Sequence, residues 1–123
     1  MFEIFMAICA LTTLECNSIT VEYYDLPDDN WYGAAAYDAD GNYYIFVDDS
    51  TEKKSEKFMR QLMAHEIAHL IVYTIDPTNT SHFGLYEEVC ADLVELAEVK
   101  GRYTCKPYAE PPPYPWTHNP RRE

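Results

Sequence analysis

In the first half of the chain, a segment with the hydrophobic spacing of a helix is followed by segments typical of strands. Residues 2–16 carry apolar side chains at helical spacing and predict a buried amphipathic helix. Residues 18–26 are rich in β-branched and aromatic residues and predict a strand, and residues 31–37 and 42–48 predict two further strands. The last two are separated by Asp-Gly, a dipeptide typical of hairpin turns. This half of the chain therefore predicts one helix followed by a small sheet.

The middle of the chain predicts one much longer element. Residues 48–75 predict a long helix, which Asp49, Ser50 or Thr51 can cap at its start. Pro77 disfavours helical geometry in the residue before it, so we expect the helix to end near residue 75. Between residues 62 and 73 the side chains are apolar on nearly every side of this helix, which predicts that it is buried.

A second helical pattern follows a short connector and precedes a proline-rich end. Residues 87–101 predict a helix that stops with Gly101 in the position after its last turn. We therefore expect an α+β fold with an N-terminal helix, a small, mostly antiparallel sheet and two further helices. The chain is long enough for one domain, assigned to residues 1–102, with residues 103–123 as a tail.

The charge of the chain limits its partners. The formal net charge is −12, and residues 1–100 hold 5 basic and 19 acidic side chains. Such a surface repels phosphate backbones, so we expect no nucleic-acid partner. A neutral or basic protein or peptide fits it better. No segment is long and apolar enough to predict a membrane-spanning helix.

The spacing of the four cysteines favours a protein of the cytoplasm. None of the four forms a CxxC pair, and buried free thiols in the reducing cytoplasm are the expectation. The apolar run at residues 5–14 resembles the core of a signal peptide, but no Lys or Arg precedes it. Export with two disulfides is the alternative. The four residues are Cys9, Cys16, Cys90 and Cys105.

Three polar residues interrupt the long apolar helix in "LMAHEIAHLIVY". His65 and His69 are four apart, so both imidazoles project from one face and can bind one metal ion. Glu66 lies on the same side, within reach of a water molecule at that metal. This is the HExxH pattern of zinc peptidases, in which the glutamate acts as general base. Burying the trio without a partner costs several kcal/mol, which favours a Zn²⁺ site.

The second helix offers carboxylates for a third ligand. Glu88 and Asp92 are four apart, and a glutamate with an acid one turn later resembles the gluzincin peptidases. That resemblance implies that Glu88 binds zinc and that Asp92 accepts the other N–H of a ligating histidine. Glu87 is the alternative carboxylate. His82, thirteen residues after His69, is an alternative nitrogen ligand, as in SprT-like proteins.

The order of elements and the motifs "HEIAHLIVY" and "EEVCADLVELA" resemble the ImmA/IrrE-type metallopeptidases of phages and mobile elements. Ala91 and Asp92 fall on that family's Ala-Asn/Asp position, which also favours Glu88. The resemblance implies a zinc endopeptidase that cleaves a regulatory, repressor-like protein. The resemblance covers roughly residues 1–100. The DNA-binding domain that often accompanies this family is not part of the pattern here.

Further residues are candidates for the remaining roles. Tyr73, Tyr86 and His82 can stabilise an oxyanion, although each tyrosine also suits simple packing. The strand at 42–48 is the candidate edge for aligning an extended peptide. In the tail, Pro111–Tyr114 reads PPPY, a form that WW domains bind. The alternative function is an acidic inhibitor or inactive peptidase relative whose zinc is structural.

Overall fold

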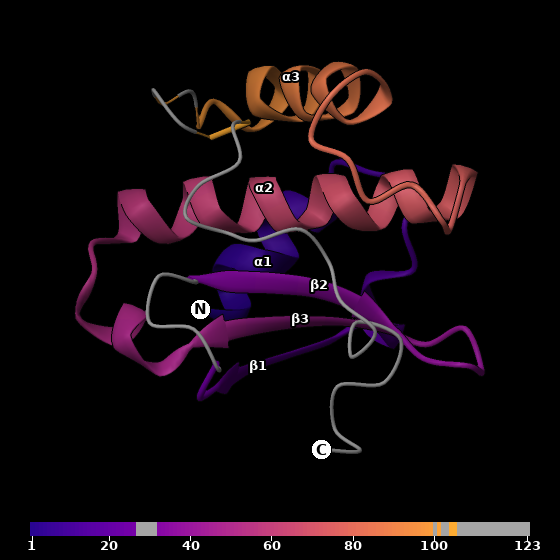
Figure 1. Cartoon of the computed structure of the whole chain (residues 1–123). Helices are drawn as coiled ribbons and strands as arrows, with labels where there is room; N and C mark the ends of the chain where they lie inside the picture. The colour runs from indigo at the N-terminus through magenta and orange to yellow at the C-terminus, as the bar shows by residue number, and fades with distance from the viewer. Residues whose placement is uncertain (27–31, 100, 102–103, 106–123) are drawn as a thin grey trace.

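The computed structural model describes residues 1–26, 32–99, 101 and 104–105. The predicted tail and its PPPY motif lie outside these residues, apart from Thr104 and Cys105. The described part has the expected α+β architecture, with three α-helices and a three-stranded sheet. Figure 1 shows these elements as layers, with the long helix between the sheet and the last helix.

The sheet contains β1 (Thr20–Tyr24), β2 (Gly33–Tyr37) and β3 (Tyr43–Asp48), in the order β1-β3-β2. β2 and β3 pair antiparallel, whereas β1 and β3 pair parallel, so the sheet is mixed. The strand expected to be an edge, β3, is instead the central strand. Its residues Ile45 and Val47 are buried in the main core, and Phe46 is buried in a smaller cluster with Leu26 and Ala36.

The turn between β2 and β3 forms where Asp40-Gly41 predicted it. Gly41 has a φ of 84°, a conformation that costs glycine little. The Asp38 carboxylate accepts hydrogen bonds from the backbone N–H groups of Asp40 and Asn42, at 2.9 and 3.0 Å. The Tyr44 hydroxyl also donates to it, at 2.6 Å. These hydrogen bonds, with that of Tyr44 the largest cause, lower the pKa of Asp38 to about 2.

The N-terminal helix is shorter than predicted. α1 spans Phe2–Cys9, and the chain then turns into a 3₁₀ helix, η1, at Cys16–Ser18. The Thr12 hydroxyl donates to the Cys9 carbonyl at 2.6 Å. This side-chain bond competes with continuation of the helix and helps to explain why it ends here.

The long helix also starts later than predicted. Asp49–Lys53 form a separate 3₁₀ helix, η2, and α2 spans Glu56–Ile75. Ser55 is the N-cap, because its hydroxyl oxygen accepts from the Phe58 N–H at 3.1 Å. Asp49, Ser50 and Thr51, the residues expected to cap it, belong to η2 instead. The predicted end at residue 75 is confirmed.

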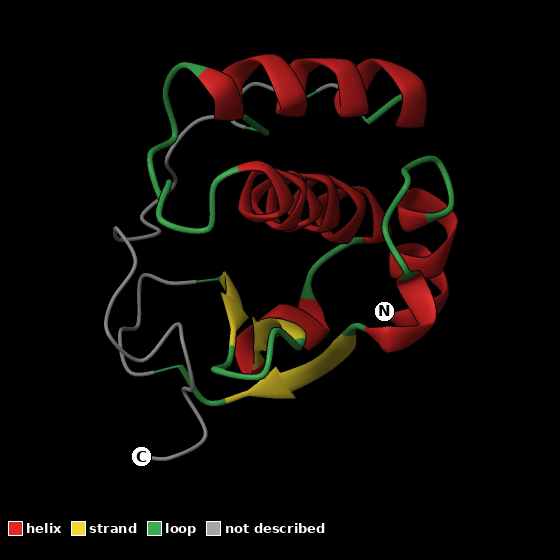
Figure 2. Cartoon of the chain, turned by 90° about the vertical axis from the view of Figure 1, so that its right-hand side faces the viewer, coloured by secondary structure: helices red, strands yellow, loops and turns green. Residues whose placement is uncertain are grey.

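The last helix, α3, spans Leu85–Ala97. It begins two residues before the predicted start, and Glu98, rather than Gly101, adopts the left-handed conformation after its end. α2 packs against α3 on one side and against β2 on the other, with α1 beside it. Figure 2 shows α2 nearly end-on, between the sheet and α3. Twelve of its twenty residues are buried, which confirms the prediction of a helix buried around most of its surface.

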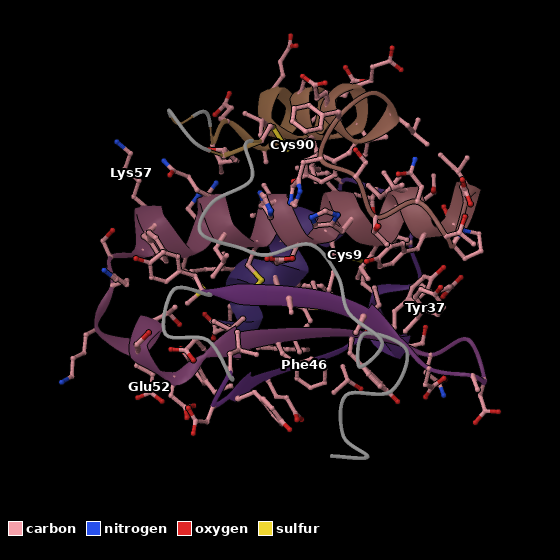
Figure 3. All side chains as sticks on the ribbon, in the orientation of Figure 1. Cys9, Tyr37, Phe46, Glu52, Lys57 and Cys90 are labelled. Carbon is pink, nitrogen blue, oxygen red and sulfur yellow. A yellow bond between two sulfur atoms is a disulfide. The ribbon has the colours of Figure 1, made fainter. Side chains whose placement is uncertain are left out.

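All four cysteines are paired, which corrects the expectation of free thiols. Cys9 bonds Cys16, and Cys90 on α3 bonds Cys105 in the segment after the helix. Figure 3 labels Cys90 on α3 and Cys9 on α1. The second disulfide bonds Cys105, a residue of the segment assigned to the tail, to α3. Among the described residues, no helix is long and apolar enough to cross a membrane.

Candidate metal centre

The middle of α2 presents the polar trio to the interior of the protein. His65 and Glu66 are completely buried, and His69 is 4% exposed. The rings of His65 and His69 lie 5.1 Å apart, one turn after the other along the same helix face. The prediction that these two imidazoles project from one face of the helix is therefore confirmed.

His82 completes the cluster from the connector between α2 and α3. Its Nε2 lies 3.1 Å from the Nε2 of His69, and its side chain is 8% exposed. A series of short turns fixes this connector. The side chains of Asp76, Asn79 and Ser81 each accept from the backbone N–H two residues further on.

A hydrogen bond to the sheet also holds the connector. The Tyr37 hydroxyl on β2 donates to the Pro77 carbonyl at 2.6 Å. Burial raises the pKa of Tyr37, and the nearby Asp76 carboxylate raises it further. The hydroxyl therefore stays protonated and remains a donor over the neutral range. This bond links β2 to the segment that carries His82.

The three histidines fit a metal ion. One ring nitrogen from each lies within 4.8 Å of the others, and all three side chains are buried. Two nitrogens bound tetrahedrally at 2.0–2.1 Å from one ion are about 3.4 Å apart, close to the distance between His69 and His82. This group of His65, His69 and His82 is called the histidine cluster below. It is positioned to bind a metal ion.

The expected carboxylate ligands of α3 lie elsewhere. Glu88 and Asp92 are exposed and do not join the histidine cluster. Glu87 is also exposed, and its carboxylate accepts from the Gly84 N–H at 3.0 Å, which caps the start of α3. The side of α3 that faces α2 carries apolar residues instead, so its acidic residues point to solvent. His82, the alternative ligand, takes the third position.

Tyr86 forms one wall of the histidine cluster. It is completely buried, and its ring stacks on His69 at 4.3 Å and lies 5.2 Å from His82. The hydroxyl donates to the backbone carbonyl of His65 at 3.1 Å. In this structure the ring of Tyr86 therefore packs against the histidine cluster, and its hydroxyl is directed to the backbone of α2.

Tyr73 lies one turn beyond His69 and links α2 to the sheet. Its ring is 6.4 Å from the His69 ring and 5.1 Å from the Tyr37 ring. The hydroxyl lies 3.5 Å from the carbonyl of Ala35 on β2, a long contact. Tyr73 thus continues the aromatic wall from the histidine cluster to the edge strand.

The Glu66 carboxylate lies against the first residue of β2. A Cβ atom added to Gly33 would sit 2.9 Å from Glu66 Oε2 and 3.2 Å from Leu62 Cδ1. Only glycine leaves room for the carboxylate at this point of the strand. The sequence gives little sign of this contact, since an isolated glycine at the start of a strand has many explanations.

The acceptor for His65 is a residue that the sequence did not indicate. His65 Nδ1 lies 2.8 Å from the backbone carbonyl oxygen of Thr104. This contact occupies the role expected of Asp92. A backbone acceptor leaves no trace in residue type, and only the neighbouring Cys105 signals that this segment returns to the domain.

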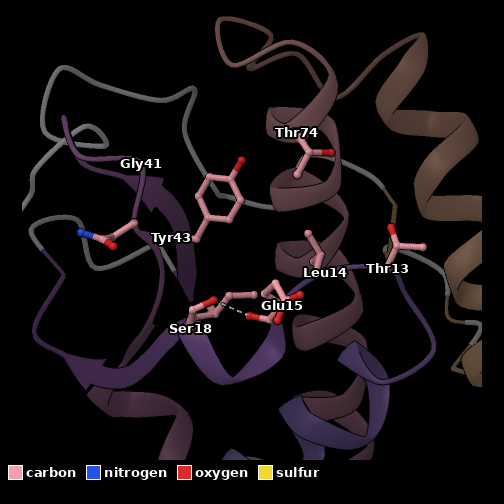
Figure 4. A pocket seen from close by; sticks show the side chains of 9 residues that line it. Thr13, Leu14, Glu15, Ser18, Gly41, Tyr43 and Thr74 are labelled. Carbon is pink, nitrogen blue, oxygen red and sulfur yellow. Dashed lines mark hydrogen bonds between the residues drawn. The ribbon is translucent and has the colours of Figure 1, made fainter.

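A separate pocket of about 420 Å³ lies near the end of α2 (Figure 4). None of the three histidines lines it. Its polar character comes mainly from hydroxyl and amide groups, and Ser18 donates to the Glu15 carbonyl at its wall. The lining residues are Thr13, Leu14, Glu15, Ser18, Ile19, Gly41, Asn42, Tyr43 and Thr74.

Comparisons with known proteins find no matching family model, no matching curated protein and no matching solved structure. The geometry of the histidine cluster and its surroundings is therefore the basis on which a function can be proposed.

Proposed function

We propose that this protein is a zinc-dependent hydrolase that cleaves peptide bonds. The observation that carries the proposal is a buried cluster of three histidines, two of which lie on α2 beside the fully buried Glu66, while the third comes from the connector after α2. Three imidazoles in a small site suit Zn²⁺ among the common divalent ions. Among the described residues the cluster offers three donors, which favours a catalytic site with an open position over a closed structural site.

The histidines and Glu66 have separate roles in this proposal. His65, His69 and His82 hold the ion, which when bound acts as a Lewis acid toward a substrate carbonyl. Glu66 accepts a proton at a carboxylate oxygen from the attacking water and passes it to the leaving amine. The apolar side chains around α2 exclude bulk water, which strengthens the interactions of these charged groups.

The edge of β2 supports an extended peptide as substrate. The Tyr32 carbonyl accepts from the Asp48 N–H at 2.9 Å, so in the alternating antiparallel pattern Gly33, Ala35 and Tyr37 turn their backbone groups away from β3. Within the described residues, no strand pairs with that side of β2. An extended chain adding there would pass Gly33, and therefore Glu66.

The two disulfides favour one cellular compartment over another. Two disulfides are typical of oxidising compartments and favour a location outside the cytoplasm, the alternative left open by the sequence. Repressor-like regulators, the substrates implied by the ImmA/IrrE resemblance, act inside cells. The proposal therefore commits to a neutral or basic peptide in extended form, which also suits the acidic surface.

Glu66→Gln tests the proposal directly. The amide keeps the volume of the side chain but accepts no proton, so zinc binding should persist while cleavage of a fluorogenic peptide library falls at least about 100-fold. Glu88→Gln is the matched control, because Glu88 is exposed, and it should keep both properties. If Glu66→Gln cleaves as fast as the wild type, or if the zinc-loaded wild type cleaves nothing in the library, the peptidase proposal fails.

A further inference from the structure

The hydrogen bond at His65 defines the chemistry of its ring. A carbonyl oxygen only accepts, so the Nδ1 atom that lies 2.8 Å from Thr104 carries the proton. The lone pair is then on Nε2, the atom available to a metal ion. Partners of this kind fix both the tautomer and the orientation of a ligating histidine.

Within the described residues, the firmest support of the Thr104 carbonyl comes through the next residue, Cys105. Thr104 is 2% exposed, but its hydrogen bonds to Val99 and Gly101 are long, at 3.5 and 3.4 Å. The next residue, Cys105, is covalently bonded to Cys90 on α3. We call Gly101, Thr104 and Cys105 the strap, because they lead from the end of α3 back to α2.

Glycine at position 101 lets the strap approach α2 closely. A Cβ atom on Gly101 would overlap the side-chain amide of Gln61, which is one turn before His65 on α2. The strap thus contacts α2 at Gln61 and at His65, and it is bonded to α3 at Cys90. Its position relative to the histidine cluster depends on these three contacts.

We propose that the Cys90–Cys105 disulfide is a positioning element of the metal centre, which holds the Thr104 carbonyl against His65 and thereby raises the affinity for metal. The inference rests on the metal site of the proposed function, but not on peptide cleavage. Reduction by a dithiol would break the S–S bond, give two cysteine thiols and oxidise the dithiol to its own disulfide. The strap would then lose its covalent connection to α3, and metal affinity would fall.

The other disulfide provides a matched control. Cys9–Cys16 joins α1 to η1, and these elements carry none of the three histidines. Its removal costs the domain a cross-link but leaves the acceptor of His65 in place. A difference between the two disulfides therefore separates positioning of the metal centre from general stability.

The first experiment measures zinc affinity of the full chain by competition with a chromophoric chelator. The variant Cys90→Ser/Cys105→Ser should bind zinc about 10–100-fold more weakly, the loss typical of removing an outer hydrogen-bond partner. The variant Cys9→Ser/Cys16→Ser should stay within about twofold of the wild type. Serine variants are preferred to reduced protein, because freed thiols can themselves bind zinc.

The second experiment observes the His65 ring in the metal-free protein by ¹H–¹⁵N correlation. The wild type and the Cys9/Cys16 variant should show the Nδ1–H tautomer with a slowly exchanging proton, and the Cys90/Cys105 variant should lose that signal. Equal zinc affinity in both variants, or an unchanged His65 ring in the Cys90/Cys105 variant, overturns the inference.

A third variant keeps the test decisive if the Cys90/Cys105 variant does not fold. Gly101→Val pushes the strap against Gln61 with both disulfides intact, and should lower zinc affinity. Adding Gln61→Ala makes room and should restore it. Failure of this pair to change affinity contradicts the positioning role but leaves the peptidase proposal standing, since Glu66→Gln tests that independently.

Discussion

The Nε2 atoms of His69 and His82 face each other at 3.1 Å, although thirteen residues separate them along the chain. At this distance one Nε2 can donate an N–H hydrogen bond to the other, or the lone pairs of both nitrogens can point to one metal ion. Because His82 lies in the connector and not on α2, its contribution to metal binding can be tested separately from the helix.

Replacing His82 should weaken metal binding far more than replacing the carboxylate that the sequence favoured. His82→Ala removes one of three donors, so zinc affinity should fall by more than the roughly 100-fold upper range for outer partners. Glu88→Ala should leave affinity unchanged, because that side chain is exposed. Isothermal titration with zinc measures both. An equal loss of zinc affinity in the two variants would indicate that Glu88 also binds the metal.

Tyr86→Phe separates packing from catalysis. The ring remains stacked on His69, and only the hydrogen bond to the His65 carbonyl is lost, so unfolding should cost about 0.5–1.5 kcal/mol less free energy. Peptide cleavage at saturating substrate should change little. An oxyanion donor would instead show a loss of about 100-fold or more, so the ratio of kcat values decides between the roles.

Gly33→Ala should disturb Glu66 without removing a ligand. The new methyl group would lie 2.9 Å from Glu66 Oε2, so the carboxylate must move or the protein loses about 1–3 kcal/mol of stability. We expect kcat to fall while zinc affinity stays within a few-fold of the wild type. The double variant Gly33→Ala/Glu66→Ala relieves the overlap. Its loss of unfolding free energy should therefore be smaller than the sum of the losses in the two single variants.

The hairpin turn gives the domain a specific sensitivity to acid. The folded pKa of Asp38, about 2, is below its ordinary value of 3.8, so its contribution to stability is complete above about pH 4 and is lost as pH falls toward 2. Asp38→Asn should remove this part of the pH dependence. Urea unfolding of both proteins at several pH values between 5 and 2 measures it. Parallel curves for the two proteins would contradict the assignment.

Much of the fold follows from local pattern. The three strands, the turn at Gly41 and the central helix have side chains whose spacing matches their burial, and His65, Glu66 and His69 share the interior because helical geometry places them there. The errors at the helix ends come from competition that spacing does not reveal. Thr12 bonds back to the Cys9 carbonyl, and Ser55 caps α2 where three earlier residues were also suitable.

The rest of the site depends on contacts between distant segments. A histidine in a polar connector has no periodic context, so His82 was a weaker candidate than a glutamate on a helix. The position of Glu88 depends on how α3 is rotated about its axis against α2, and the resemblance to other peptidases did not determine that rotation. Thr104 acts through its backbone, which every residue possesses.

The order of the sheet has a consequence for how the two sides of the site form. β2 and β3 are joined by a tight turn, so the hairpin that carries Gly33 closes with little loss of chain entropy. The bond between His65 and Thr104 instead closes 39 residues of chain. Contacts of such separation form late in folding and are more readily lost in local opening. The β2–β3 hairpin, which would receive a peptide under the proposed function, is therefore set by local contacts, whereas the hydrogen bond that orients the His65 ring depends on a distant segment.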